Sequence, residues 1–75
     1  METQKFTVES LKAQIYSVPI PKDWREGQFV FNRVEELYKD TARKVQFIDN
    51  VDCFYLNGEI DRFLTHVVAR LNSQV

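Results

Sequence analysis

Residues 21–38 restrict the fold most, because they describe one amphipathic helix in the middle of a short chain. Asp23 and Glu26 have the spacing of a capping box, in which the aspartate accepts from first-turn N–H groups and the glutamate reaches back to the cap. Pro21 disfavours an earlier helical start. Small and apolar residues then recur at helical spacing, at Gly27, Val30, Phe31, Val34, Leu37 and Tyr38. The sequence therefore predicts a central helix over residues 22–39.

A second clear helix is predicted over residues 58–72. The pair Asn57-Gly58 marks a turn and a cap, and acidic residues follow in the first turn, where they favour a helix start. Apolar residues then repeat at i, i+3, i+4 and i+7 without interruption, at Ile60, Phe63, Leu64, Val67, Val68 and Leu71.

The remaining segments are less regular. A first helix is predicted over residues 7–17 with Thr7 as its N-cap, and a strand over residues 14–18 is the competing interpretation. Residues 40–45 form a further helical turn that either continues the central helix or breaks from it. Residues 45–57 form either a hairpin or an irregular loop, and we favour the loop, pinned by Phe47, Phe54 and Tyr55. Together these patterns predict an all-α domain of three helices.

Composition limits the classes of protein. The 75 residues suit a single domain spanning 1–75, and one cysteine with one histidine provides neither a disulfide nor a structural zinc site. The net charge of −1 argues against a general nucleic-acid binder. No apolar run is long enough for a membrane span, and the first residues lack an apolar signal region. We expect a cytoplasmic protein with Cys53 reduced, no cofactor and no membrane contact.

Two sets of residues could in principle form a catalytic or a metal site. Cys53 and His66 could form a thiolate–imidazole dyad, but no third orienting residue or oxyanion loop accompanies them. His66 falls with Arg62 and Arg70 on a face expected to be solvated. Four acidic residues crowd the region before the last helix, but they fail the EF-hand spacing: Asp49, Asp52, Glu59 and Asp61. The sequence predicts no enzyme and no metal site.

Phe29 is the residue that best suggests a partner. It lies on the charged face of the central helix, so either the first helix covers it, which we favour, or it marks an interface. Trp24, at the helix start, has the same two interpretations: it lies either at the edge of the core or in an interface, where it anchors a partner. The candidate interface comprises Trp24, Arg25, Phe29 and Arg33.

Basic residues provide an alternative, a nucleic-acid patch. Two ridges are available, and the candidate residues are Lys39, Arg43, Lys44, Arg62 and Arg70, with His66 beside the last two. Acidic residues close to both ridges dilute their field, so solvated helix faces are the plainer explanation.

A set of residues around Gly27 points to a structural role. A mid-helix glycine indicates close approach of another backbone, and the amides of Gln28 and Asn32 could bind the loop at residues 49–54. The residues assigned to this motif are Gly27, Gln28, Phe31, Asn32, Asp52, Phe54 and Tyr55.

These residues also carry a resemblance. Residues 24–32 and 51–55, and Ile60 with Phe63 and Leu64, resemble small uncharacterised proteins of phages, prophages and bacterial genomes. The shared pattern is Gly-Gln-x-x-Phe-Asn, then Asp-x-Phe-Tyr, then Ile-x-x-Phe-Leu. The resemblance covers residues 20–71, and Cys53 stands where the group often has proline. The resemblance implies a phage or mobile-element context, and it does not point to any particular activity.

The sequence therefore favours a small non-enzymatic module that binds a protein partner or a second copy of itself. A small nucleic-acid-binding regulator is the alternative. A small-molecule substrate is not expected.

Overall fold

The structure is a computed structural model that describes residues 6–73. Along this part of the chain the elements are α1 (Val8–Ile15), α2 (Glu26–Leu37), α3 (Lys39–Phe47), the 3-10 turn η1 (Asn57–Glu59) and α4 (Ile60–Ser73). No strand occurs between residues 6 and 73. The predicted all-α class is confirmed, and α3 is a separate helix beyond the three expected.

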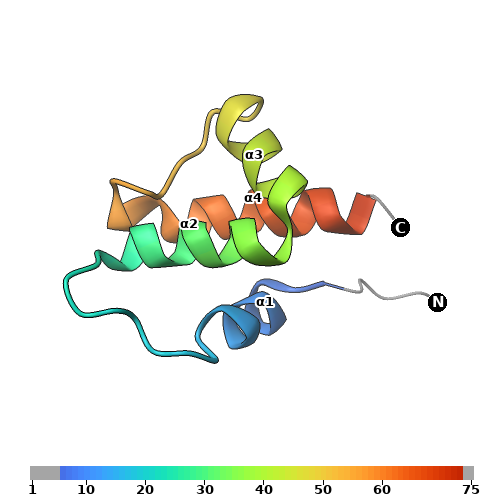
Figure 1. Cartoon of the computed structure of the whole chain (residues 1–75). Coiled ribbons are helices and arrows are strands. Elements are labelled where there is room, and N and C mark those ends of the chain that lie inside the picture. Colours follow the sequence, from blue (N-terminus) through green and yellow to red (C-terminus); the bar gives the residue numbers. More distant parts are fainter. Residues whose placement is uncertain (1–5, 74–75) are drawn as a thin grey trace.

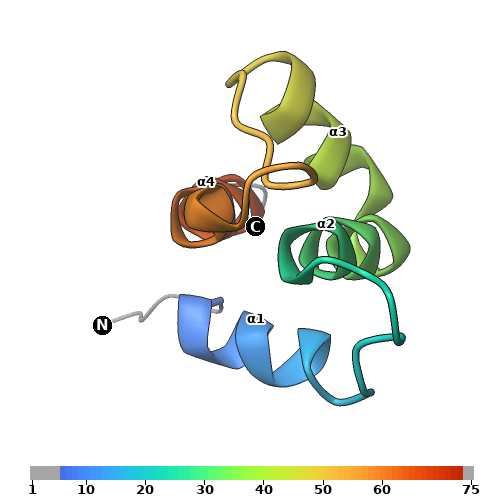
Figure 2. The same cartoon turned by 90° about the vertical axis from the view of Figure 1, so that its left-hand side faces the viewer.

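The helices α2 and α4 lie side by side and run in the same direction, with α1 against one side of this pair and α3 against the other (Figure 1, Figure 2). The ring centroids of Phe31 in α2 and Phe63 in α4 are 5.3 Å apart, so large side chains fill the space between the two helices. Because α2 and α4 run in the same direction, α3 and the connection at residues 48–56 must return the chain to the N-terminal end of α2.

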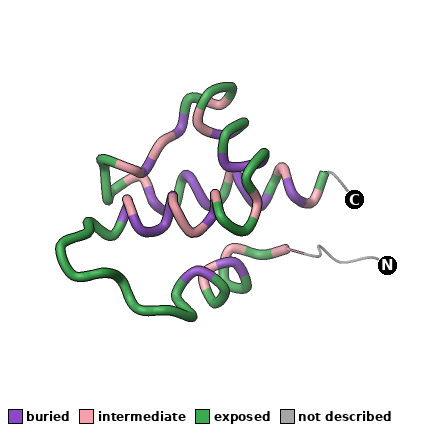
Figure 3. Tube along the Cα trace, in the orientation of Figure 1, coloured by how far each residue is buried: buried purple, intermediate pink, exposed green. Residues whose placement is uncertain are grey.

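One hydrophobic core lies where the four helices face one another (Figure 3). The six apolar residues predicted for the inner face of the last helix are all buried. In α3, Ala42 and Val45 are buried and Arg43 and Lys44 are exposed, as expected. None of the helices in the described part is long and apolar enough to cross a lipid bilayer.

The first helix begins as predicted and ends earlier than predicted. The hydroxyl of Thr7 accepts from the N–H of Ser10 at 3.0 Å, and the hydroxyl of Ser10 accepts from the N–H of Thr7 at 3.1 Å, which forms a capping box. Leu11 and Ile15 are buried, and the helix ends at Ile15 instead of residue 17. The competing strand interpretation is wrong.

The predicted start of the central helix is wrong. Asp23 has a φ of 82°, which is incompatible with the extended backbone of a helix N-cap. Residues 21–24 instead form a turn, in which the N–H of Trp24 donates to the carbonyl of Pro21 at 3.2 Å. The helix begins at Glu26 with no side-chain cap, and the carboxylate of Glu26 accepts from the hydroxyl of Tyr16 at 2.8 Å.

The end of the central helix settles an open alternative. Tyr38 has φ −142° and ψ 71°, so α2 ends at Leu37 and α3 is a new helix. It continues to Phe47, further than the helical turn expected at residues 40–45. The connection that follows is irregular, as favoured over a hairpin, and Asn50 turns the chain with a φ of 59°.

Gly27 makes the close backbone approach that the sequence indicates. A Cβ atom at this position would lie 2.0 Å from the carbonyl oxygen of Cys53. The N–H of Gly27 donates to the side-chain oxygen of Asn57 at 2.8 Å, and the thiol of Cys53 donates to the carbonyl of Gly27 at 3.4 Å. The first turn of α2 therefore touches both ends of the segment that leads into α4.

Substituting Gly27→Ala should destabilise the protein by about 1–3 kcal/mol or more, because a methyl group overlaps a backbone carbonyl that cannot move alone. Gly58→Ala is the matched control, since nothing lies within 4 Å of a Cβ at that position. Urea unfolding of both variants measures the difference. Equal midpoints for the two would contradict the close contact.

Candidate functional site

One of the four candidate interface residues, Phe29, belongs to the interior of the fold. Phe29 is 2 % exposed and its ring centroid lies 5.9 Å from that of Tyr16, so α1 and the residues after it cover this face of α2. Phe29 as an exposed partner contact is therefore wrong, and the favoured alternative, cover by the first helix, is confirmed. The central helix packs on two sides because α1 also needs an apolar surface.

Arg33 holds the end of α1. Its Nε donates to the carbonyl of Ile15 at 3.1 Å and its Nη2 to the carbonyl of Gln14 at 2.8 Å. The last carbonyls of a helix lack intrahelical partners, and a guanidinium supplies the missing donors and a favourable charge. The structure thus gives Arg33 a structural role, and its place in an interface stays a prediction.

Arg25 and Trp24 are exposed at the start of α2. The guanidinium carbon of Arg25 lies 5.8 Å from the ring centroid of Phe54 and 5.3 Å from that of Tyr55. Such stacking stabilises by about 0.5–1 kcal/mol at exposed sites. Trp24 is 42 % exposed, so of the four candidates it is the one that offers a large free apolar surface.

The candidate nucleic-acid patch is largely neutralised within the protein. Arg43 pairs with Glu35 at 3.2 Å, Arg62 with Glu59 at 3.5 Å, and Arg70 with Asp49 at 2.6 Å. Within residues 6–73, Lys39 and Lys44 form no ion pair. Two unpaired lysines of α3 make a weak attraction for a phosphate backbone, which several basic residues usually contact.

Asp49 joins α3 to α4 through a cluster that the sequence does not reveal. Arg70 donates to it from both Nε and Nη2, at 3.0 and 2.6 Å, and Nδ1 of His66 lies 3.1 Å from the same carboxylate. The hydrogen bonds from Arg70 lower the pKa of Asp49 from 3.8 to about 2, with a further contribution from His66. The expectation that His66 and Arg70 form a free outward ridge is wrong, because Asp49 occupies both.

Cys53 is the buried structural thiol that was expected. It is fully buried, and burial followed by the nearby charge of Asp52 raises its pKa to about 12. A thiol with this pKa stays protonated and is a poor nucleophile. Among residues 6–73, no three histidine, cysteine, aspartate or glutamate side chains are grouped so that they could hold a metal ion.

The amides of Gln28 and Asn32 do not bind the connection, contrary to expectation. No hydrogen bond joins either amide to residues 49–54 in the described part of the structure. The connection supplies its own polar contacts: Gln46 donates to Asp52 at 3.0 Å, and Asp52 accepts from the N–H of Phe54 at 2.8 Å. The contact with Gly27 is direct, which makes an amide bridge unnecessary.

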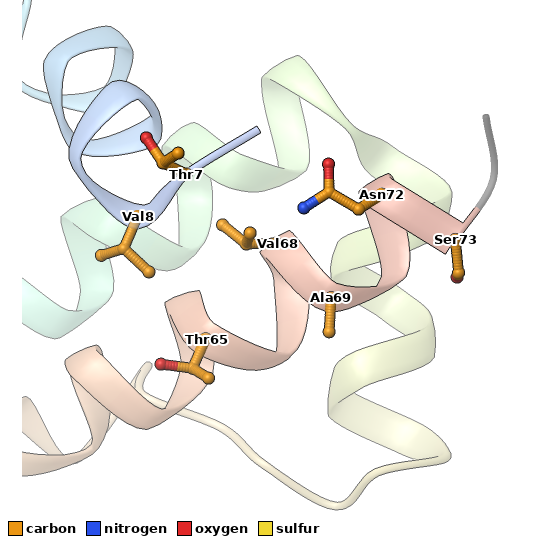
Figure 4. A pocket seen from close by; sticks show the side chains of 7 residues that line it. All are labelled: Thr7, Val8, Thr65, Val68, Ala69, Asn72 and Ser73. Carbon is orange, nitrogen blue, oxygen red and sulfur yellow. The ribbon is translucent and has the colours of Figure 1, made fainter. Parts of the chain in front are cut away.

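A surface hollow of about 610 Å³ lies between the start of α1 and the second half of α4 (Figure 4). Its lining has no ionisable side chain and comprises Thr7, Val8, Thr65, Val68, Ala69, Asn72 and Ser73. The amide of Asn72 is engaged in hydrogen bonds with the backbone N–H and carbonyl of Phe6, at 2.9 and 3.0 Å. The hollow therefore has no group for acid–base chemistry.

The feature that sequence reasoning missed is a set of exposed large apolar side chains at both ends of the connection between α3 and α4. Phe47, Ile48, Tyr55 and Leu56 are 74, 68, 72 and 59 % exposed, and we call these four residues the connection surface. Phe47 and Tyr55 were expected to pin the loop inward, but of the three aromatic residues named for this role Phe54 alone packs against the core.

The signal that could have found this surface is weak. Phe47 lies two positions after Val45, the last inward residue of α3, so helical spacing places it on the opposite face, and Ile48 lies just beyond the end of the helix. Tyr55 and Leu56 precede the cap of α4, a segment with no periodicity to assign a side. Their exposure depends on where the connection crosses α2.

Comparisons with protein-family models, with curated proteins and with solved structures found no match to this chain.

Asp49→Asn should lower the stability at neutral pH and lose its effect in acid. The folded pKa of Asp49 is depressed, so the carboxylate stabilises the fold above its unfolded pKa of 3.8, and this contribution fades as the pH falls through about 2. The free energy of unfolding, compared with wild type by denaturant titration between neutral and acidic pH, measures it. Asp61→Asn, whose carboxylate is 86 % exposed, is the control. A pH-independent difference for Asp49→Asn would contradict the assignment.

Proposed function

We propose that this chain is a small non-catalytic protein-binding domain and that the connection surface is its contact site. The exposure of Phe47, Ile48, Tyr55 and Leu56 carries the proposal. Apolar residues scattered singly over a surface need no explanation, whereas two adjacent pairs of large exposed apolar residues, one at each end of a short segment, favour an interaction site. Aromatic residues are also enriched among those that dominate binding energies.

The geometry of the connection supports this use. The segment is held from beneath by the contact of Gly27 with Cys53 and from the side by the pairing of Asp49 with Arg70. Figure 1 shows that the connection runs from the C-terminal end of α3, past the N-terminal end of α2, to the start of α4. A segment fixed in this way presents its side chains with little entropy to lose on binding, which favours affinity.

Catalysis and nucleic-acid binding have less support. The raised pKa of Cys53 and the engagement of His66 by Asp49 leave no nucleophile–base pair that we can assemble from residues 6–73. Three of the five candidate basic residues are in ion pairs, which reduces the field available to a phosphate backbone.

The proposal includes a setting. The resemblance of residues 20–71 to small phage and prophage proteins supports a phage or mobile-element context. The free thiol of Cys53 is the form expected in a reducing compartment, which supports a cytoplasmic location.

A photo-crosslinking phenylalanine analogue placed at Phe47 or Tyr55 should give discrete adducts in cells that produce the protein. Mass spectrometry identifies the partner peptide and shows whether it comes from a second copy or another protein. The control is the same analogue at Val18, which is 43 % exposed and lies outside the connection surface. Adduct yields at positions 47 and 55 no higher than at position 18 would overturn the proposed surface.

A further inference from the structure

We infer that a second copy of this chain covers the connection surface about a two-fold axis, so that Phe47 and Ile48 of one copy contact Tyr55 and Leu56 of the other. The inference rests on the proposed function and names its partner. Two observations support it: the size of the surface and the charge of the protein.

The first observation is size. An aromatic side chain presents roughly 150–250 Å², so Phe47 and Tyr55, which are 74 and 72 % exposed, present on the order of 300 Å² together, and the exposed side chains of Ile48 and Leu56 add to this area. A standard interface buries about 800 Å² on each partner, of which about 57 % is apolar. The connection surface therefore supplies about the apolar area that one face of a small stable dimer requires, and the neighbouring polar side chains of α3 and α4 supply its rim.

The second observation is charge. The formal net charge of the chain is −1, so two copies meet with little overall repulsion. Two basic residues of α4 near the connection are paired within the chain, Arg62 with Glu59 and Arg70 with Asp49, whereas Lys44, three residues before Phe47, forms no ion pair. One unpaired lysine gives a weak field for a strongly acidic partner, and a second copy needs no such field.

The symmetry follows from the position of the two apolar pairs. Phe47 and Ile48 stand at one end of the connection, and Tyr55 and Leu56 stand at the other. In a two-fold interface, if residue i contacts residue j of the partner, then j contacts i. An axis through the middle of the connection exchanges its two ends, so each pair in one copy meets the opposite pair in the other and all four side chains are covered.

The experiment is sedimentation or light scattering of the purified chain from micromolar to millimolar concentration, followed by disulfide trapping. The apparent mass should rise from one chain toward two. Phe47→Ser with Ile48→Ser should weaken dimerisation at least tenfold without unfolding the protein, because both residues are exposed. The control, Val18→Ser with Ile20→Ser, removes apolar residues that are 43 and 39 % exposed elsewhere and should leave dimerisation unchanged.

Trapping tests the arrangement. A mixture of Ile48→Cys and Leu56→Cys chains should form a disulfide-linked pair between the two variants under mild oxidation, whereas either variant alone should give far less. The buried Cys53 does not compete. Equal linkage in the single-variant samples would overturn the crosswise arrangement.

The outcomes separate this inference from the proposed function. A wild type that stays monomeric at millimolar concentration, or a dimer that persists in the Phe47→Ser, Ile48→Ser variant, overturns the inference. If the photo-crosslinker at Phe47 then captures another protein, the proposed function stands without the dimer. If it captures nothing, both fail.

Discussion

The contact between Gly27 and the carbonyl of Cys53 is the constraint on which the arrangement of the chain depends. It brings the backbone of the connection against the first turn of α2, closer than any side chain would allow. Asn57 then accepts from the N–H of Gly27, so the segment that starts α4 is fixed at the same point. Because α2 and α4 run in the same direction, the chain must return to this end of α2, and the missing side chain at Gly27 leaves room for it.

Asp49 provides a second attachment at the far end of the connection. Its carboxylate binds Arg70 and His66 of α4. Asp49 directly follows the exposed pair Phe47-Ile48 in the sequence. The connection is therefore held at both ends by polar or backbone contacts. Val51 and Cys53 in its middle are buried, whereas Ile48, Tyr55 and Leu56 toward its ends are exposed, and this exposure is the structural reason to look for a partner.

The predictability of each element followed the strength of its local pattern. The repeat from Ile60 to Leu71 leaves one solution, and α4 buries all six residues as expected. Asp23 has the right spacing for a cap, but Pro21 and the turn after it place its backbone at φ 82°, and local spacing does not register that conflict. The exposure of Phe47 and Tyr55, and the pairing of Asp49 with Arg70 across 21 positions, depend on the path of the connection and had no local signal.

The attachment of α1 has a consequence for how the protein folds. The amide of Asn72 bonds to the backbone of Phe6 across 66 positions, and Arg33 holds the other end of α1, while α3 contacts both α2, which it directly follows, and α4. Contacts between positions distant in sequence form slowly, because the chain between them must first be closed into a loop. We therefore expect α1 to dock late in folding, and until it docks the surface that Leu11 and Ile15 cover stays open to water.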